Sequence, residues 1–427
     1  MVQREGVPLP NINAGNTAWV LASTALVLFM TPGLAFFYGG MVRRKNVLGM
    51  LMQNYVVMGL VGVVWVWVTY SLAFGPDWGG HGLIGSLHFA GLANVDTQAV
   101  PGYTGALAQT IPPLVFVIFQ MMFAVITVGL ITGSSADRLK FGAFVTFAVA
   151  WSILVYAPVA HWVFSPTGWL AKRGAEDFAG GTVVHINAAM AGLALAVVAG
   201  RRKGWPEKKM EPHNVPFILL GGGILWFGWF GFNAGSALAA NNLSAHAFVN
   251  TNTAAAMALL GWIGVEKVRN KKSTTIGAVS GAVAGLVAIT PACGFVNLFG
   301  ATIIGLAAGV LCCLAVGVKF RLKVDDSLDV LAVHFVGGVS GALLIGLFGT
   351  AAIGGKDALF YGGGAGLLGH EALAVLSVAI YSFVVSALIA LAIKKSIGLR
   401  VSEENEEIGL DLSQHGESAY DFAHETS

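Results

Sequence analysis

Charged residues are scarce in this sequence. They make up 11% of its 427 residues, whereas about a quarter of an ordinary soluble domain is charged. A chain of this kind cannot cover a globular surface in water. Cysteine is also rare, and Cys293, Cys312 and Cys313 have the spacing of neither a zinc site nor a disulfide framework. We therefore expect no metal and no cofactor, and we interpret the cysteines as packing residues.

Long apolar segments make up most of the sequence. Apolar residues make up 56% of the chain, and 57 glycines without a collagen period suit closely packed membrane helices. A membrane span needs about 20 apolar residues, and a charge at its centre is costly. Seven windows that lack charged residues can each hold one helix: 6–42, 46–76, 97–136, 141–171, 178–200, 330–355 and 372–393. Two longer windows, 212–265 and 273–318, can each hold two.

The two longer windows contain polar or helix-breaking residues at which a hairpin can turn. The first turns at Asn241, Asn242 and Ser244, and the second turns within 290–294. The sequence therefore predicts an all-α polytopic membrane protein with eleven transmembrane helices. Because eleven is odd, the two termini lie on opposite faces of the membrane.

Basic residues decide the orientation of the spans. Twenty Lys and Arg residues fall on one face, in segments 43–45, 138–140, 201–209, 267–272, 319–323 and 394–400. The opposite face has four, which are Arg4, Lys172, Arg173 and Lys356. Cytoplasmic loops carry the excess of basic residues. We therefore expect the N-terminus outside and the C-terminus in the cytoplasm of a plasma-membrane protein, and topology explains the basic residues without any nucleic-acid site.

An internal repeat joins two distant segments. The segment from Asp177 reads DFAGGTVVHINAAMAGLALA and the segment from Asp326 reads DSLDVLAVHFVGGVSGALLI, so each has a histidine eight residues after an aspartate. Small residues follow both histidines at the same offsets. In the predicted topology the first helix runs inward and the second outward, which is an inverted repeat of the kind used by secondary transporters.

The repeat divides the chain into parts. Five-helix repeats occupy about 17–200 and 212–350, an extra helix occupies about 372–396, and together they form a transmembrane domain over 1–397. Residues 398–427 form an acidic cytoplasmic tail.

His185 and His334 occupy equivalent positions in the two repeats. A lone histidine in a helix is usually a satisfied core residue. Inside a membrane, however, an ionisable side chain is costly and marks a functional site by default. We therefore predict that His185 and His334 act together near the repeat interface, whereas His161, at the end of a span, needs only an interfacial role.

Several motifs resemble those of the ammonium transporter (Amt/Mep/Rh) family, in the expected order and over nearly the whole chain. They are FFYGGMVRRKNVL at 36–48, DFAGGTVVHINAAMAG at 177–192, GWFGFNAGSA at 228–237, AITPACG at 288–294, DDSLDVLAVH at 325–334 and GLRVSEENEEIGLDLSQHGESAY at 398–420. The tail motif favours the Amt branch, of bacterial or archaeal type. The resemblance implies a transporter rather than an enzyme, a homotrimer in the lipid bilayer, and one narrow apolar pore in each subunit.

The resemblance also implies roles for individual residues. Phe123 and Phe232 match a phenylalanine gate, and His185 and His334 match the twin histidines of the pore. Phe119, Phe123 and Ser236 match an outer site that recruits ammonium between aromatic rings and a hydroxyl. Asp177 matches an aspartate at the outer mouth, where it can also cap the start of its helix.

One member of the outer site departs from the family pattern. Where the family usually has a tryptophan, AHWVF places Phe164, and Trp169 follows five residues later. Either Phe164 replaces the tryptophan with a weaker cation–π face, or loop 165–168 lets Trp169 reach the same place.

The expected mechanism follows from the cost of burying an ion. Moving an isolated ammonium ion into an apolar pore costs on the order of tens of kcal/mol. The expected route is therefore to bind ammonium or methylammonium outside, remove a proton and pass neutral ammonia along the two imidazoles, with proton co-movement. The alternatives are a Rhesus-like channel for neutral gas, an ammonium sensor, and a membrane redox protein whose histidines hold haem iron.

The acidic tail has two interpretations. By composition it is a solvated segment that balances loop charge. The resemblance instead implies a region that packs under the trimer and couples the subunits to a PII-type signalling protein. In that case residues 403–407 would lie against the basic loops 201–209, 267–272 and 319–323.

Overall fold

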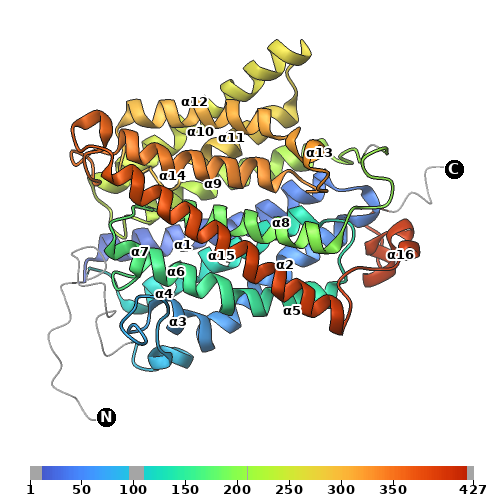
Figure 1. The fold of residues 1–427 in the computed structure, drawn as a ribbon, viewed down its shortest axis with the longest axis horizontal. Helices are drawn as coiled ribbons and strands as arrows, with labels where there is room; N and C mark the ends of the chain where they lie inside the picture. The colour runs from blue at the N-terminus through green and yellow to red at the C-terminus, as the bar shows by residue number, and fades with distance from the viewer. Residues whose placement is uncertain (1–11, 96–109, 209, 421–427) are drawn as a thin grey trace.

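The computed structural model describes residues 12–95, 110–208 and 210–420, and over these residues the chain is helical without any named β-strand. The starts of the predicted windows 6–42 and 97–136, and residues 421–427 of the tail, lie outside the described residues. The long helices run side by side along one axis, as Figure 1 shows. The principal elements are α1 (Ala14–Met41), α2 (Val47–Val64), η2 (Trp65–Thr69), α3 (Tyr70–Phe74), α4 (Pro113–Ile131), α5 (Phe141–Trp151), η6 (Ser152–Tyr156), α6 (Ala157–Phe164), η7 (Gly181–Ile186), α8 (Asn187–Ala199), α9 (Val215–Gly235), α10 (Asn242–Asn270), α11 (Thr275–Ile289), α12 (Leu298–Ala315), η8 (Leu331–Phe335), α14 (Val336–Phe348) and α15 (Gly366–Ser396).

Short helical turns lie between these elements or follow them. They are η1 (Arg44–Asn46), η3 (Leu87–Leu92), η5 (Thr132–Ser135), α7 (Trp169–Lys172), α13 (Val318–Leu322), η9 (Leu359–Tyr361), α16 (Glu403–Ile408) and η10 (Asp411–His415). The last two belong to the tail, which is therefore folded over the described residues up to 420.

Ten helices in the described part of the chain are long and apolar enough to cross a membrane. An eleventh apolar helix, α11, has only 15 residues. Windows 212–265 and 273–318 each contain two helices, and the breaks between them fall where the polar residues predicted them. Asn241 caps α10 by accepting a hydrogen bond from the backbone N–H of Ser244, and Asn297 caps α12 in the same way through Gly300.

Small residues let the helices approach closely. A Cβ atom on Gly341 of α14 would lie 1.9 Å from the carbonyl oxygen of Ala288 in α11, so only glycine fits there. On the outside of the bundle, large apolar residues face outward, including Trp67, Ile380 and Leu388, which are 64%, 63% and 60% exposed. An apolar exterior over small-residue contacts inside is the pattern expected of a protein whose solvent is lipid.

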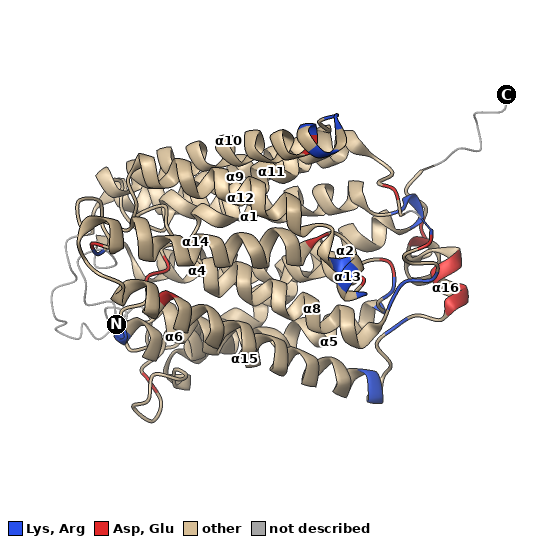
Figure 2. Cartoon of the chain, turned by 45° about the horizontal axis from the view of Figure 1, so that its top comes forward, with Lys and Arg blue, Asp and Glu red and all other residues tan. Residues whose placement is uncertain are grey.

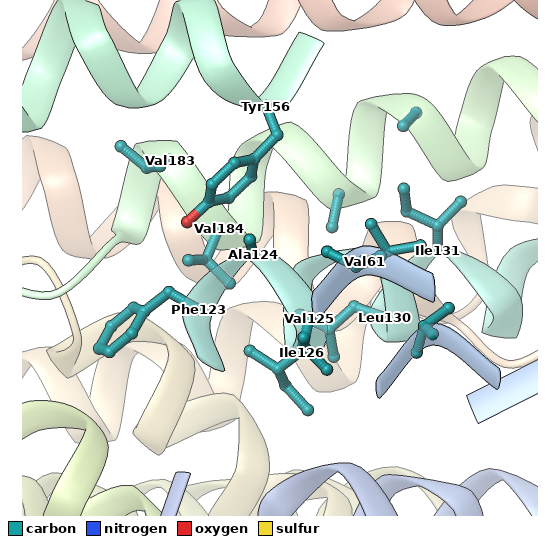
Figure 3. Packing of buried hydrophobic residues seen from close by; sticks show 14 of the residues in the cluster. Val61, Phe123, Ala124, Val125, Ile126, Leu130, Ile131, Tyr156, Val183 and Val184 are labelled. Carbon is teal, nitrogen blue, oxygen red and sulfur yellow. The ribbon is translucent and has the colours of Figure 1, made fainter. Parts of the chain in front are cut away.

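Charge is concentrated at the ends of the bundle. Figure 2 shows Lys and Arg gathered mostly at the end that also carries the acidic helix α16, with largely uncharged helices between the two ends. Inside the bundle, Phe123 and Ala124 of α4 pack near Tyr156 of η6 and Val183 and Val184 of η7 (Figure 3). This packing fixes η7, the short segment that carries His185.

Candidate functional site

His185 and His334 meet inside the bundle, where their side chains are 1% and 3% exposed. Their Nδ1 atoms are 3.3 Å apart, and the ring centroids are 5.3 Å apart with 23° between the planes. This geometry fits one hydrogen bond, in which one Nδ1–H donates and the other Nδ1 accepts. Because only an unprotonated ring nitrogen accepts, at least one of the two rings is neutral.

Asp177 builds the local structure that holds His185. Its two carboxylate oxygens accept hydrogen bonds from the backbone N–H groups of Gly180, Gly181, Thr182 and Val183 and from the Thr182 hydroxyl, at 2.5–3.3 Å. These N–H groups begin a helix and have no partners within it. The cap is followed by η7, a π-helical turn that contains His185. The predicted capping role of Asp177 accounts for these contacts.

Asp326 begins the second copy in the same manner. Its Oδ2 accepts from the backbone N–H of Leu331 at 2.7 Å, and η8, again a π-helical turn, contains His334. Helix α14 packs against η7, and α8 packs against η8. Since each helix thus passes the beginning of the other, the two run in opposite directions where they cross.

Aromatic rings line one side of the histidine pair. Phe123 and Phe232 are stacked with centroids 4.2 Å apart, and Phe119 meets Phe123 edge-on at 4.9 Å. His185 lies over Trp229 at 5.4 Å and near Phe232 at 6.1 Å, so the Phe123–Phe232 stack is continuous with the imidazole pair. The structure therefore brings the predicted gate and the predicted histidines into one column of rings.

Ser236 lies one turn beyond Phe232. Its hydroxyl donates to the Phe232 carbonyl at 2.8 Å, which leaves the oxygen lone pairs able to accept from another donor. A Cβ on the neighbouring Gly235 would lie 3.1 Å from the Phe119 ring. Phe119, Phe123 and Ser236 are thus gathered at the end of the ring column that is farther from His334.

The two candidates for the missing tryptophan lie in different surroundings. The tip of the Phe164 ring lies 3.6 Å from where a Cβ on Gly180 would be, next to the start of η7. Trp169 instead packs edge-on against Trp162 at 5.8 Å and lies under the Arg173 guanidinium at the same distance. Phe164 thus lies beside the start of η7, whereas Trp169 packs on Trp162.

A cavity of about 500 Å³ opens on the other side of the pair. Its inner wall contains His334, Val330 and Val333, and its sides are formed by the end of α10 and by residues 205, 206, 208 and 210–212. Asp329 also lines it and pairs with Lys319 at 2.8 Å. Burial raises the pKa of Asp329 to about 6, although the Lys319 charge opposes the shift.

His161 is buried in the last turn of α6. Its Nδ1 lies 2.9 Å from the Ala73 carbonyl oxygen and its Nε2 lies 3.2 Å from Asp77 Oδ1, so both ring nitrogens have partners. The three cysteines are unpaired thiols, two of them buried, in agreement with a packing role.

The tail folds onto one end of the bundle. Lys203 of loop 201–209 pairs with Glu407 at 2.8 Å and with Glu403 at 3.4 Å, while Asp411 accepts from the backbone N–H of Gly49 at 2.8 Å. Glu406 forms an ion pair with Arg400 at 2.5 Å. The Lys203 ammonium donates a hydrogen bond to the Glu407 carboxylate. This contact stabilises the charged form of Glu407 and lowers its pKa.

The predicted contacts of the tail are thus only partly as expected. Within the described residues, none of its ion pairs reaches loops 267–272 or 319–323, and the second surface it covers is 43–49 together with 138–141. Lys203 is exposed and pairs with the tail, whereas Lys319 is paired with Asp329 inside the cavity.

Two groups of residues were not predicted from the sequence. Trp229 stacks on His185 and donates to the Thr290 hydroxyl at 2.8 Å; its place three residues before Phe232 was the available signal. A buried charge network also lies beneath η8, where Arg202 binds Asp325 at 2.8 Å. Although burial opposes it, the hydrogen bonds and charge of Arg202 lower the pKa of Asp325.

The site thus consists of two turns that each begin at a capping aspartate, a column of aromatic rings, and a cavity on the other side of the histidine pair. A sequence profile of the Ammonium Transporter Family matches residues 18–420. The chain belongs to this family.

Relatives within the family match over nearly their whole lengths. The ammonium transporter of Mycobacterium tuberculosis (strain ATCC 25618 / H37Rv) is 52% identical, over 98% of this chain and 92% of the relative. That of Bacillus subtilis (strain 168) is 47% identical, over 95% and 98%. The crystal structure of Candida albicans Mep2 superposes with a TM-score of 0.87 at 34% identity, over 99% of this chain and 94% of that one. These matches and the apolar helices establish a multi-pass membrane protein, and they confirm the predicted family.

Proposed function

We propose that this chain takes up ammonium and methylammonium, binding the cation outside, removing a proton and conducting ammonia past His185 and His334 with co-movement of the proton. The observation that carries the proposal is the continuous column from the Phe123–Phe232 stack to the hydrogen-bonded imidazoles. An apolar gate followed by groups that can accept and donate a proton suits a substrate that crosses as a neutral molecule.

The physical reason lies in the cost of desolvation. An isolated cation placed between two buried phenylalanine rings would lose its hydration, at a cost on the order of tens of kcal/mol. Ammonia keeps one lone pair and three N–H groups, so it can donate to one imidazole nitrogen and accept from the other. Among the described residues, His185 Nε2 has no hydrogen-bond partner, so it is available for such a contact.

Recruitment occurs at the end of the column that holds Phe119, Phe123 and Ser236. The ring faces attract a small cation, and the Ser236 oxygen accepts one of its hydrogen bonds. We assign the remaining wall to Phe164, because its ring lies by Gly180 whereas Trp169 packs on Trp162.

The alternatives have distinct signatures. A Rhesus-like gas channel would move methylamine without charge, and a sensor would bind ammonium without sustained uptake. A haem protein would need the two histidines on opposite sides of an iron atom, with nitrogens about 4 Å apart, whereas 3.3 Å is the distance of a direct hydrogen bond. None of these accounts for the gate and the pair as directly as ammonia conduction does.

The predicted assembly belongs to the same proposal. It has eleven spans, with α11 as the shortest, two inverted repeats and an extra helix, the N-terminus outside and the tail in the cytoplasm. Three copies form a homotrimer, and a PII-type protein binds beneath it. The ion pairs of Lys203 with the tail support this part of the proposal. They hold the tail beside the loop that borders the cavity, where a PII-type protein would bind.

Growth and uptake experiments test the transport proposal. Cells that lack their own ammonium carriers would receive this chain, and uptake of labelled methylammonium would be followed together with growth on limiting ammonium. We expect rescue by the wild type, loss with His334→Ala, and full rescue with the matched control His81→Gln, since His81 is exposed in a loop. Absence of rescue by well-expressed wild type would refute the proposal.

Deletion of 398–427 tests the role of the tail. We expect the truncated protein to fold and to form trimers, but to lose PII binding and to change the coupling between subunits. The charge-reversal variant Lys203→Glu should weaken PII binding in the same direction, since it breaks the two ion pairs of Lys203. Unchanged PII affinity and unchanged transport after the deletion would show that the tail has no role in either.

A further inference from the structure

His161 is a buried ionisable side chain that the proposed transport path does not use. It is 0% exposed, in the last turn of α6, which packs against α3. Its Nδ1 lies 2.9 Å from the carbonyl oxygen of Ala73, and its Nε2 lies 3.2 Å from Oδ1 of Asp77. Each ring nitrogen therefore faces an oxygen at hydrogen-bonding distance.

The chemistry of these two oxygens decides how many protons the His161 ring carries. A backbone carbonyl oxygen only accepts hydrogen bonds, and an ionised carboxylate likewise only accepts them. A neutral imidazole has a single N–H, so it can donate to one of the two oxygens, while its other nitrogen faces the second oxygen without a proton between them. Both contacts are hydrogen bonds only when both ring nitrogens are protonated, which makes the ring a positively charged imidazolium.

The surroundings of Asp77 support the same protonation state. Its side chain is 8% exposed, and its Oδ2 is buried without a hydrogen-bond partner among the described residues. Within that part of the chain, His161 is the one basic side chain that lies within ion-pair distance of Asp77. A buried carboxylate without a counter-charge is costly. Because a carboxyl group is more acidic than an imidazolium, the proton between the two belongs to the ring.

The pair joins α6 to a short hairpin at residues 77–85, between α3 and η3. An antiparallel bridge between its first and last residues closes the hairpin, and Asp77 Oδ1 also accepts from the backbone N–H of Gly82 at 3.0 Å. The Trp162 indole N–H donates to the Leu83 carbonyl at 2.7 Å. The hairpin therefore holds the last turn of α6 through His161 and through the residue that follows it.

Phe164 belongs to this same turn, three residues after His161. A Cβ on Gly168 would lie 2.0 Å from the His161 carbonyl oxygen, so the loop after α6 packs directly on the backbone of the turn. The Phe164 ring reaches from the turn to the start of η7, beside Gly180. Since the hairpin fixes the turn, it also determines where the Phe164 ring lies.

We propose that His161 is a charged imidazolium paired with Asp77, and that this pair positions Phe164 at the outer recruitment site. His161 and Asp77 are positioning residues that do not touch the substrate. The charge of the ring follows from the contacts of the pair alone. The effect on recruitment rests on the proposed function, and the two parts are therefore tested by separate measurements.

Nitrogen-15 NMR of the purified protein in lipid bilayers tests the charge of the ring without any transport. Protonated and unprotonated ring nitrogens give separate signals, and His161→Gln identifies those of His161 among the 10 histidines. At neutral pH we expect two protonated His161 nitrogens in the wild type and in the control His81→Gln, which replaces an exposed histidine of the same hairpin.

Asp77→Asn removes the counter-charge, so we expect one His161 nitrogen to lose its proton. If His161→Gln does not fold, the signal that changes in Asp77→Asn identifies the ring. An unprotonated His161 nitrogen in the wild type, or no change in Asp77→Asn, would overturn the assignment of charge.

Uptake kinetics test whether the pair acts through Phe164. We expect Asp77→Asn to raise the KM for methylammonium several-fold with little change in the maximal rate, because the phenylalanine stack and the histidine pair are untouched. His81→Gln should change neither. Phe164→Ala should also raise the KM, and adding Asp77→Asn to it should have little further effect, because two changes that act through one contact are not additive.

Two results would overturn the positioning role. One is a lower maximal rate with an unchanged KM in Asp77→Asn, and the other is the same factor in KM with and without Phe164→Ala. Lack of uptake by every form, the wild type included, would instead contradict the transport function and leave the NMR result standing.

Discussion

The two copies of the internal repeat have the same local structure, but their histidines lie in different surroundings. Each has an aspartate eight residues before its histidine, a residue with positive φ three positions after that aspartate, and a π-helical turn that contains the histidine. In the first copy the cap takes five hydrogen bonds and the histidine is enclosed by aromatic rings. In the second copy Asp326 accepts a backbone hydrogen bond from Leu331, and His334 lines an open cavity.

This difference indicates that the repeat provides the histidine pair. The surroundings of each copy determine whether its histidine is enclosed or borders a cavity. The first copy ends at a closed stack of rings, and the second opens into about 500 Å³. The same local backbone structure therefore lies in different surroundings in the two copies. Changes in the first copy should accordingly cost more than the same changes in the second.

The largest expected difference concerns the two caps. Asp177→Asn replaces an acceptor-only group by one that also carries donors, and it weakens several charge-assisted hydrogen bonds. We expect a loss of about 3 kcal/mol in stability and loss of uptake, against about 1 kcal/mol for Asp326→Asn. Thermal unfolding of the purified variants measures both. Equal losses would mean that the two caps are equivalent and that the comparison fails.

A smaller difference is expected at the residue with positive φ. Gly180 has φ 114°, and a Cβ there would lie 2.6 Å from Val184 Cγ2, so Gly180→Ala should cost about 2 kcal/mol. The equivalent Asp329 has φ 60°. In Asp329→Gly the relief of backbone strain is offset by the lost Lys319 pair and by a more flexible unfolded chain, and the net change should stay within about 0.5 kcal/mol. The unfolding temperatures of Gly180→Ala and Asp329→Gly, each compared with that of the wild type, test this prediction.

Asp329 also makes the second copy sensitive to pH. Because burial raises its folded-state pKa to about 6, above the value in the unfolded chain, its protonated form favours the folded state. That contribution is fully present below about pH 4 and is lost as pH rises through about 6. We expect the unfolding temperature to decline over this window and Asp329→Asn to reduce the decline. An identical slope in the variant would assign the decline to other groups.

The smallest effect is expected at the outer site. Phe164→Trp should strengthen binding of ammonium by about 0.5–1 kcal/mol, since tryptophan has the stronger cation–π face. Methylammonium uptake at several concentrations gives the apparent affinity. If Phe164→Trp changes nothing and Trp169→Ala weakens uptake, then Trp169 provides the ring.

Much of this architecture could be predicted from the sequence, because membrane spans and the Asp-to-His spacing leave strong local patterns. The paired helices in windows 212–265 and 273–318 were predicted from a few polar residues, since a hairpin must turn where its backbone can meet water or caps. The stacked phenylalanines of the proposed gate were found by resemblance alone, because two phenylalanines 109 positions apart carry no sign of stacking in the sequence.

Other features depend on tertiary packing that the sequence does not reveal. The burial of Glu371 against the amide of Glu176 requires α15 to cross the start of η7, and a glutamate in the first turns of a span otherwise looks like an interfacial residue. The contact of the tail with Lys203 was predicted by charge, but the sequence does not show that Lys319 is paired with Asp329. The stacking of Trp229 on His185 likewise depends on the crossing of helices.

The central claim is that His185 and His334 form one functional unit, and a double-mutant comparison tests it most directly. Uptake and proton-linked current would be measured for His185→Ala, His334→Ala and the double variant at matched expression. We predict that each single substitution removes selective transport and that the double is little worse than either, because members of one unit are not additive. Losses that multiply across the two sites would show that the histidines act separately and would contradict this account.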